Sequence, residues 1–474
     1  MPRDFPCRIG PKSGSKSLVL TKREGPHSEF VERSNWHNAR HGGAGLRMQI
    51  MYVVGDEEAE ALARIIHEGK LFRYGVGNEC DRFEERYASY LGVGQFALTV
   101  SGTFALSAAM VALGIGPGDE VLIPAHTYMA TATAVLTTGA IPVIVDVDES
   151  VTIDPKAVEA AIGPRTKAVV PVHMWGAACD MNAIMDIARR HKLWVIEDSC
   201  QGVGGSYEGK KFGSIGDVGA FSFNYYKNMT AGEGGGVATS DEEVAKRARC
   251  AIDPCHFYWT GREDGSKPFA GNGGRASELM GAMLNVQLDR IDGLVGAMRA
   301  EKKKIIAGTK RLSNFGLNLS PMNSADHDCA AHVMYLLPTA EDATRFTKIF
   351  PAVIAGKTGR HTYTEWDQVL MGMGAAHPAM NPYNHPDNAA CRKTYSKTMC
   401  ARSLDILNRT VMVPTHPKHS NAEIDAIIHN IEAATKVALG GMSPDVVALK
   451  ETTALDVQKF DMAIIDSDPS ARSE

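Results

Sequence analysis

Short apolar runs recur between residues 96 and 240, most of them about 22 to 26 residues apart. Each run is too short for a stable helix, so each predicts a buried β-strand. Helical patterns lie between several of them, for example the one that repeats Met181, Ile184, Met185 and Ala188. This alternation predicts an α/β fold with a mainly parallel sheet wrapped by helices. The predicted strands cover residues 96–100, 121–123, 143–147, 168–172, 193–196, 218–223 and 236–238.

Helices are predicted on both sides of this region. Asp56 can begin a helix that places Leu62, Ile65 and Ile66 on one face. A second helix groups Phe83, Tyr87 and Tyr90 and ends at Gly92. The apolar pattern from Leu279 to Met298 predicts one long helix that leads away from the sheet.

The chain divides into four parts by pattern and charge. Residues 1–48 carry nine Lys or Arg against four acids and no apolar period, which predicts a mobile extension. Residues 49–300 form the large domain, and residues 301–440 mix strands, helices and loops as a smaller α+β domain. Residues 441–474 carry seven acids against three bases and predict an acidic tail.

Composition excludes several classes of function. With 50 Lys or Arg against 55 Asp or Glu among 474 residues, no general positive field exists to bind nucleic acid. The nine cysteines form no C-x-x-C pair, so we expect no metal site and a reduced, cytoplasmic protein. The start of the chain has no apolar stretch after its basic residues, so we expect no secretory signal.

One uncharged run, Val121 to Val145, is long enough to span a bilayer. Pro124, Gly139 and Pro142 interrupt it. A buried strand, a helix and a second strand explain this run better than a membrane span, so we expect no membrane association.

Polar residues follow three of the predicted strands. Ser101-Gly102-Thr103 stands between a strand and a helix that begins near Phe104. Free amides at a helix N-terminus, a glycine and a hydroxyl make a seat for phosphate. The alternative is that the hydroxyl only caps the helix.

The other two strand ends carry charged groups. Glu197 and Asp198 follow the strand that begins at Leu193, and a buried acid there is either ligand-bound or part of a structural ion pair or cap. Lys227 lies between a strand and a glycine-rich return into the next strand. Because parallel strands end at one edge of a sheet, we expect these groups to meet there, together with Tyr128.

A phosphate seat, an acid, a lysine and an aromatic ring are the groups that pyridoxal phosphate requires. Lysine forms the imine, the acid keeps the ring nitrogen protonated, and the aromatic face stacks on the ring. A dinucleotide site needs G-x-G-x-x-G after the first strand, and that motif does not occur there.

At this point the sequence resembles the DegT/StrS sugar aminotransferases, which share the aspartate-aminotransferase fold (fold type I). The likeness covers roughly residues 49 to 436. It rests on the stretches SGTFALSAAMVALGIGPGDEVLIPAHTYMATA, RTKAVVPVHMWG, VIEDSCQGVGGSYEGKKFGSIGDVGAFSF and K-x-x-T-x-G-E-G-G at residues 227–235. It implies that residues 49–300 are the domain that binds pyridoxal phosphate.

The resemblance also implies roles for single residues. Lys227 would form the internal aldimine and then move the proton between substrate carbon and cofactor, by way of a pyridoxamine phosphate intermediate. Asp198 would hold the pyridine nitrogen, and Gln201 would lie near the ring hydroxyl unless it is a helix-surface amide. Gly102, Thr103 and Ser222 would bind phosphate, and Tyr128 would stack on the ring.

Members of this family are homodimers that share their active sites, the partner sending a G-x-N-x-R segment toward the phosphate. In this chain the corresponding sequence is Gly271-Asn272-Gly273-Gly274-Arg275, in which the Asn lies one position earlier than in the family pattern. Asn272 or Arg275 is therefore the expected contact.

The activity implied is transfer of an amino group from glutamate or glutamine to a keto-sugar. LFRY at 71–74 and RTVMVPTHP at 409–417 are similar to enzymes that aminate eight-carbon keto-sugars, while nucleotide-linked keto-sugars and inososes remain alternatives. A sugar dehydratase or lyase of the family would have His in place of Lys227. A non-catalytic regulator that binds the cofactor could lose the lysine or the acid, and this chain has both.

Overall fold

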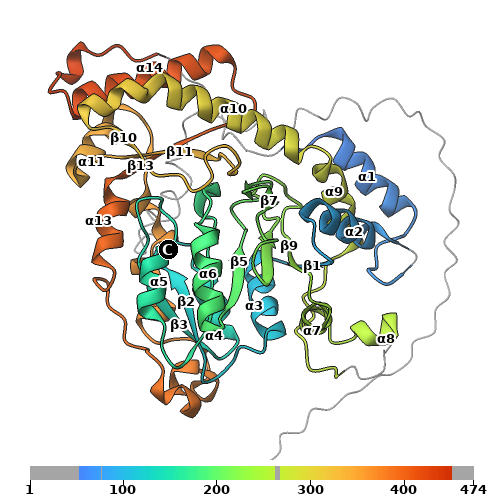
Figure 1. Cartoon of the computed structure of the whole chain (residues 1–474). Coiled ribbons are helices and arrows are strands. Elements are labelled where there is room, and N and C mark those ends of the chain that lie inside the picture. Colours follow the sequence, from blue (N-terminus) through green and yellow to red (C-terminus); the bar gives the residue numbers. More distant parts are fainter. Residues whose placement is uncertain (1–52, 76, 262–266, 451–474) are drawn as a thin grey trace, which may run out of the picture. The chain divides into compact units, whose positions relative to one another are not determined.

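The computed structural model describes residues 53–75, 77–261 and 267–450 (Figure 1). The predicted extension, residues 1–48, lies outside the described residues, as does most of the predicted acidic tail, residues 451–474. The first residues of that tail, up to Lys450, fold back onto α14 (Asn421–Ala438), where the Lys450 amide donates to Asn430 Oδ1 at 2.9 Å.

A seven-stranded sheet forms the centre of the structure, and all seven predicted strands are present with shifted ends. Its spatial order is β1 (Gln95–Thr99), β9 (Gly235–Thr239), β8 (Val218–Ser222), β5 (Trp194–Asp198), β4 (Thr166–Val169), β2 (Glu120–Pro124) and β3 (Ile141–Val145). The strands from β8 to β3 are parallel, and β9 is antiparallel to both neighbours. β9 returns antiparallel because the loop from residue 223 to 234 contains no crossover helix.

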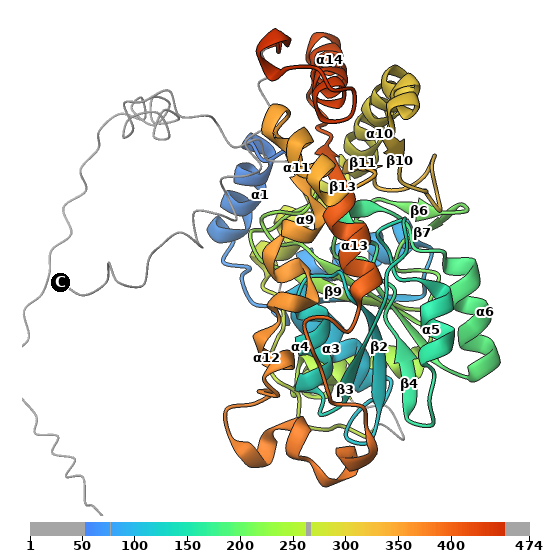
Figure 2. The same cartoon turned by 90° about the vertical axis from the view of Figure 1, so that its left-hand side faces the viewer.

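Helices cover both faces of this sheet (Figure 2). Val121 and Ile123 pack toward α3 (Gly102–Ala112), α4 (Ala130–Thr137) and α7 (Glu242–Ile252). Leu122 between them packs in the opposite core, with α2 (Glu79–Leu91), α5 (Pro155–Ala161) and α6 (Met181–His191). Successive residues of a strand point to opposite faces, so a sheet covered on both sides needs apolar residues at every position. This confirms the strand–helix–strand interpretation of residues 121–145.

The predicted long helix from Leu279 to Met298 is wrong, because the chain breaks at Asp289–Arg290 into α9 (Glu278–Leu288) and α10 (Ile291–Thr309). α9 packs against α1 (Asp56–His67) and α2. The Arg290 side chain pairs with Glu57 and Glu58 of α1, which fixes the break. None of the described helices is long and apolar enough to cross a bilayer.

A second sheet of four strands packs with α10, α11 (Ala340–Ile349) and α14. Its order is β10 (Asn318–Leu319), β11 (His332–Leu336), β13 (Thr410–Pro414) and β12 (Val353–Ile354). The domain boundary predicted after residue 300 stays a prediction, and α10 runs through it as one helix. The remaining strands and α-helices of the described residues are β6 (Ser206–Tyr207), β7 (Lys210–Lys211), α8 (His256–Thr260), α12 (Asp367–Leu370) and α13 (Ala401–Arg409).

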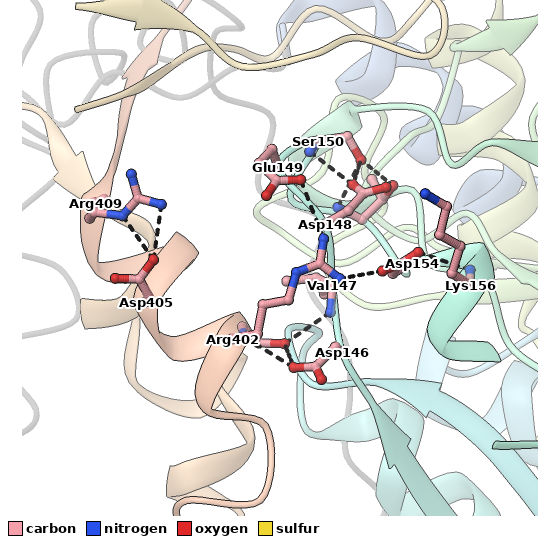
Figure 3. Close-up of polar contacts among 12 residues, drawn as sticks. Asp146, Val147, Asp148, Glu149, Ser150, Asp154, Lys156, Arg402, Asp405 and Arg409 are labelled. Atoms are coloured by element: carbon pink, nitrogen blue, oxygen red, sulfur yellow. Dashed lines mark hydrogen bonds and ion pairs between the residues drawn. The ribbon is translucent and has the colours of Figure 1, made fainter. Parts of the chain in front are cut away.

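Polar contacts attach α13 to the loop after β3 (Figure 3). Arg402 pairs with Asp154 and, at 3.4 Å, with Glu149. The Ser403 amide donates to Asp146 Oδ1 at 3.1 Å, and the Val147 amide donates to Ser403 Oγ at 2.9 Å. These bonds join α13, the helix that precedes β13 of the second sheet, to the loop that follows β3 of the central sheet.

Candidate active site

The ends of neighbouring strands bring the predicted site residues to one edge of the central sheet. Asp198 is the last residue of β5 and is paired in register with Ala220 of β8, two residues before Ser222. Lys227 follows β8, and Tyr128 follows β2 just before α4. The sheet topology thus groups residues that are up to 99 positions apart in the sequence.

Asp198 is 4% exposed and lies among neutral donors. The Thr131 hydroxyl donates to its Oδ2 at 2.8 Å, and the Cys200 amide donates to its Oδ1 at 3.2 Å. Within the described ranges no Lys, Arg or His forms a salt bridge with this carboxylate. A buried carboxylate held only by neutral donors is available to a cationic ligand group.

Glu197, one position earlier, is the structural acid of the pair. It is fully buried and accepts from the amides of Gly213, Ile215 and Gly216 at 2.9, 2.6 and 2.7 Å. His173 Nε2 lies 3.0 Å from its Oε2. Glu197 thus has the contacts of a structural acid, whereas the ligand-bound interpretation of Asp198 stays a prediction. The two acids differ in their surroundings because consecutive strand residues face opposite sides.

Lys227 is half-buried, and burial lowers the pKa of its amine, while Cys200 and Asp198 act in the opposite direction. A lowered pKa increases the neutral fraction of the amine, which is the nucleophilic form. The next residue holds the turn in place: Asn228 Nδ2 donates to the Val203 carbonyl at 3.1 Å and contacts Cys329 Sγ at 2.8 Å.

The phosphate seat predicted from the sequence lies at the first turn of α3. Ser101 Oγ accepts from the Phe104 amide at 3.2 Å, so this hydroxyl does cap the helix. The amides of Gly102 and Thr103 have no intrahelical acceptor at these positions. A Cβ on Gly102 would lie 2.7 Å from Ser222 Cβ and 2.9 Å from Cys200 Sγ, so only glycine lets the helix start beside Ser222.

Trp175 and His361, which were not predicted as site residues, lie beside Tyr128 and Gln201. Gln201 lies in a turn rather than on a helix, and its Oε1 accepts from the Trp175 amide at 3.0 Å. The Trp175 and His361 rings lie 4.7 Å apart, and the Tyr128 and His361 rings lie 5.4 Å apart. The HMWG phrase at 173–176 was the available sequence signal for Trp175.

His126 is a fully buried histidine beneath this group. Trp175 Nε1 donates to His126 Nε2 at 2.9 Å. Because an indole N–H can only donate, Nε2 must accept, so the imidazole is neutral with its proton on Nδ1. Burial, followed by the charge of His361, lowers the pKa of His126 to about 3.

This burial predicts an acid-sensitive fold. The unfolded chain takes up a proton near pH 6.5 and the folded chain does not, so His126 stabilises fully above pH 6.5 and loses its contribution as pH falls toward 3. We expect the free energy of unfolding to fall by up to about 1.4 kcal/mol for each pH unit because of this residue. Urea midpoints at pH 7.5 and 5.5 measure it, and His126→Gln, which keeps an acceptor for Trp175, should show a flatter profile. Parallel profiles for the two proteins would contradict the assignment.

The segment predicted to reach a partner subunit also has contacts within its own chain. Asn272 is exposed, and its amide donates to the Ala251 carbonyl at 3.1 Å. Arg275 Nη1 lies 3.1 Å from Asp253 Oδ1, and Asp253 is only 1% exposed. Arg275 is thus engaged in an ion pair, which leaves Asn272 as the freer side chain of the segment.

The geometry fits pyridoxal 5'-phosphate, because a close-packed glycine at a helix N-terminus, a buried carboxylate and a lysine of lowered pKa meet at one sheet edge. Fold and site together define a pyridoxal-phosphate-dependent enzyme of fold type I. The chain belongs to the DegT/DnrJ/EryC1/StrS aminotransferase family, whose model matches residues 53–432.

Known relatives carry sugar aminotransferase names. The chain is 34% identical over 364 residues to GDP-perosamine synthase of Caulobacter vibrioides. The aligned region covers 74% of this chain and 89% of that protein. DesV of S. venezuelae, solved in complex with a ketimine intermediate, is similar with a TM-score of 0.64 and 29% identity, covering 80% of this chain and 94% of that one.

A third relative was solved with its cofactor. NtdA of Bacillus subtilis, with bound PMP, matches with a TM-score of 0.63 and 25% identity over 83% of this chain and 87% of that one. Sugar aminotransferase chemistry with pyridoxal phosphate follows from this membership.

Proposed function

We propose that this enzyme transfers the amino group of L-glutamate or L-glutamine to a keto-sugar. The donor's amino-bearing carbon becomes a carbonyl, and the sugar's carbonyl carbon gains the amino group and a hydrogen, so the exchange needs no outside oxidant or reductant. The observation that carries the proposal is the meeting of Lys227 and Asp198 at one edge of the sheet.

Pyridoxal phosphate, when bound, supplies a carbonyl that receives the amino group and a ring that takes up the electron pair of the substrate carbon. We assign the binding of its phosphate to the first amides of α3 at Gly102 and Thr103 and to the Ser222 hydroxyl. Asp198 is assigned to the ring nitrogen and Tyr128 to the ring face. Gln201 is assigned to the ring hydroxyl.

Lys227 is assigned two tasks. Its neutral amine attaches the cofactor between turnovers, and the same amine then removes and returns the proton at the substrate carbon. The buried position of Asp198 supports its role, because its charge acts more strongly away from bulk water.

The proposal includes a cytoplasmic homodimer with shared active sites. The eight cysteines in the described ranges are free, as expected for a reducing compartment. Phe72, Tyr258 and Trp259 are 45%, 80% and 47% exposed, and the rings of Phe72 and Trp259 lie 5.4 Å apart. A cluster of exposed aromatic rings is typical of a protein interface.

Subunit mixing tests the shared site. Asn272→Asp places a negative charge where a neighbour's phosphate is expected, so both this variant and Lys227→Ala should be inactive alone. Mixed dimers should regain activity in the site that combines Lys227 of one chain with Asn272 of the other. If mixed dimers form and stay inactive, Asn272 does not serve its neighbour's site.

A panel of keto-sugars tests the function. The purified protein is converted to its amino form with L-glutamate or L-glutamine, and loss of that form's absorbance is followed on adding nucleotide-linked keto-sugars, inososes and eight-carbon keto-sugars. We expect one class to react much faster than the others. Failure of both amino acids to convert the cofactor would overturn the donor assignment, and failure of the whole panel would overturn the acceptor assignment.

A further inference from the structure

A segment from the second half of the chain lies directly beside Tyr128. Residues 360–363 run antiparallel to residues 125–129, with an isolated bridge between His126 and Thr362. The Met129 amide donates to the Arg360 carbonyl at 3.0 Å, and the Tyr363 amide donates to the Ala125 carbonyl at 3.0 Å. The segment therefore extends along the turn that carries the predicted ring-stacking residue.

Buried aromatic side chains anchor this segment. Tyr363 is fully buried and donates from its hydroxyl to the Lys397 carbonyl at 2.7 Å. Trp366 is 1% exposed, and its Nε1 donates to the same Arg360 carbonyl at 3.0 Å. The backbone of Arg360 thus accepts two hydrogen bonds, which fixes the point from which its side chain extends.

The Arg360 side chain itself is exposed and lies over an aromatic ring. Its Cζ lies 5.3 Å from the centroid of the Tyr128 ring. No carboxylate of the described ranges lies within salt-bridge distance of it, whereas Arg275, Arg392 and Arg402 each pair with a buried or half-buried acid. A guanidinium held over a ring without an anionic partner is ready to bind an anion from solution.

We propose that Arg360 binds a carboxylate group of a substrate at the mouth of the active site, an inference that rests on the proposed function. A planar carboxylate matches the fork of one guanidinium, with two parallel N–H···O bonds. A diphosphate carries more charge than one arginine neutralises. The carboxylate comes either from the amino-acid donor or from an acidic keto-sugar.

The two halves of the reaction separate these sources. Arg360→Gln removes the charge, Arg360→Lys keeps the charge without the fork, and Lys357→Gln removes an exposed charge three residues earlier as a matched control. The first half of the reaction is measured with cofactor-loaded protein and L-glutamate. The second half is measured with the amino form of the protein and the keto-sugar. Each half is measured as a single turnover. We expect Arg360→Gln to raise the substrate concentration for half-maximal rate by at least about tenfold in one half, with a smaller change in the limiting rate.

Binding without turnover gives a second measurement. L-glutamate and the keto-sugar are titrated calorimetrically into cofactor-loaded Lys227→Ala protein, with and without Arg360→Gln. Weakened binding of L-glutamate alone assigns the carboxylate to the donor, and weakened binding of the keto-sugar alone assigns it to the acceptor. Weakening of both means that the two substrates use Arg360 in turn.

Three outcomes overturn the inference. Arg360→Gln could match the wild type in both halves, Lys357→Gln could have the same effect as Arg360→Gln, or Arg360→Gln could lower only the limiting rate. Failure of the proposed function is distinct, because the wild-type protein itself would then show neither half of the reaction.

Discussion

Replacement of Lys227 by alanine is expected to lower turnover by at least about a thousandfold. The change removes both the amine that attaches the cofactor and the group that moves the proton. The fold should remain, because the turn is held by Asn228 through Val203 and Cys329, and the phosphate seat does not use Lys227. Turnover at matched cofactor concentrations measures the expected loss of activity. The urea midpoint measures whether the fold is retained.

Borohydride reduction followed by peptide mapping checks the same assignment in the wild-type protein. The trapped adduct should lie on Lys227, and exposed Lys210 of β7 serves as a control that should stay unmodified and whose alanine variant should be active. An adduct on another lysine would show that the strand-end assignment is mistaken.

Asp198→Asn is expected to lower the rate by at least roughly a hundredfold. The amide keeps the shape of the side chain but cannot hold a protonated ring nitrogen as an ionic partner. Asn can still accept a hydrogen bond from Thr131, which now donates to Asp198 at 2.8 Å, so stability should change little. The rate constant and the thermal midpoint are measured on the same preparation.

Glu197→Gln is the matched control for that experiment. Glu197 accepts hydrogen bonds from three amides and contacts His173, so its loss of charge should lower the thermal midpoint more than Asp198→Asn does. Near-normal activity of Asp198→Asn would mean that Asp198, too, is only a structural acid.

The strands and the strand-end residues could be predicted because they depend on local pattern. Leu122 is flanked by Val121 and Ile123, and a run that is apolar at every position indicates a strand covered on both faces. The residues at the ends of such runs, Gly102 and Asp198 among them, then fall at one edge by topology alone. The family resemblance added roles to these residues, and those roles remain predictions.

The break between α9 and α10 could not be predicted from the local pattern. Both helices continue the same apolar period, and the break depends on Arg290 reaching Glu57 and Glu58, more than 200 residues earlier. A periodic pattern reports which side of a helix is buried, but it does not report where a distant partner bends the chain.

The sequence by itself determined the α/β class, the positions of the strands and the set of residues at their ends. Only the tertiary structure decided which acid is structural, since Glu197 and Asp198 are adjacent and differ in what faces them. It also decided that Arg360 lies over Tyr128, 232 positions away, and that Arg275 pairs with Asp253. The physical reason is that burial and periodicity are local properties of a chain, whereas the partner of a charged side chain depends on which distant segments pack beside it.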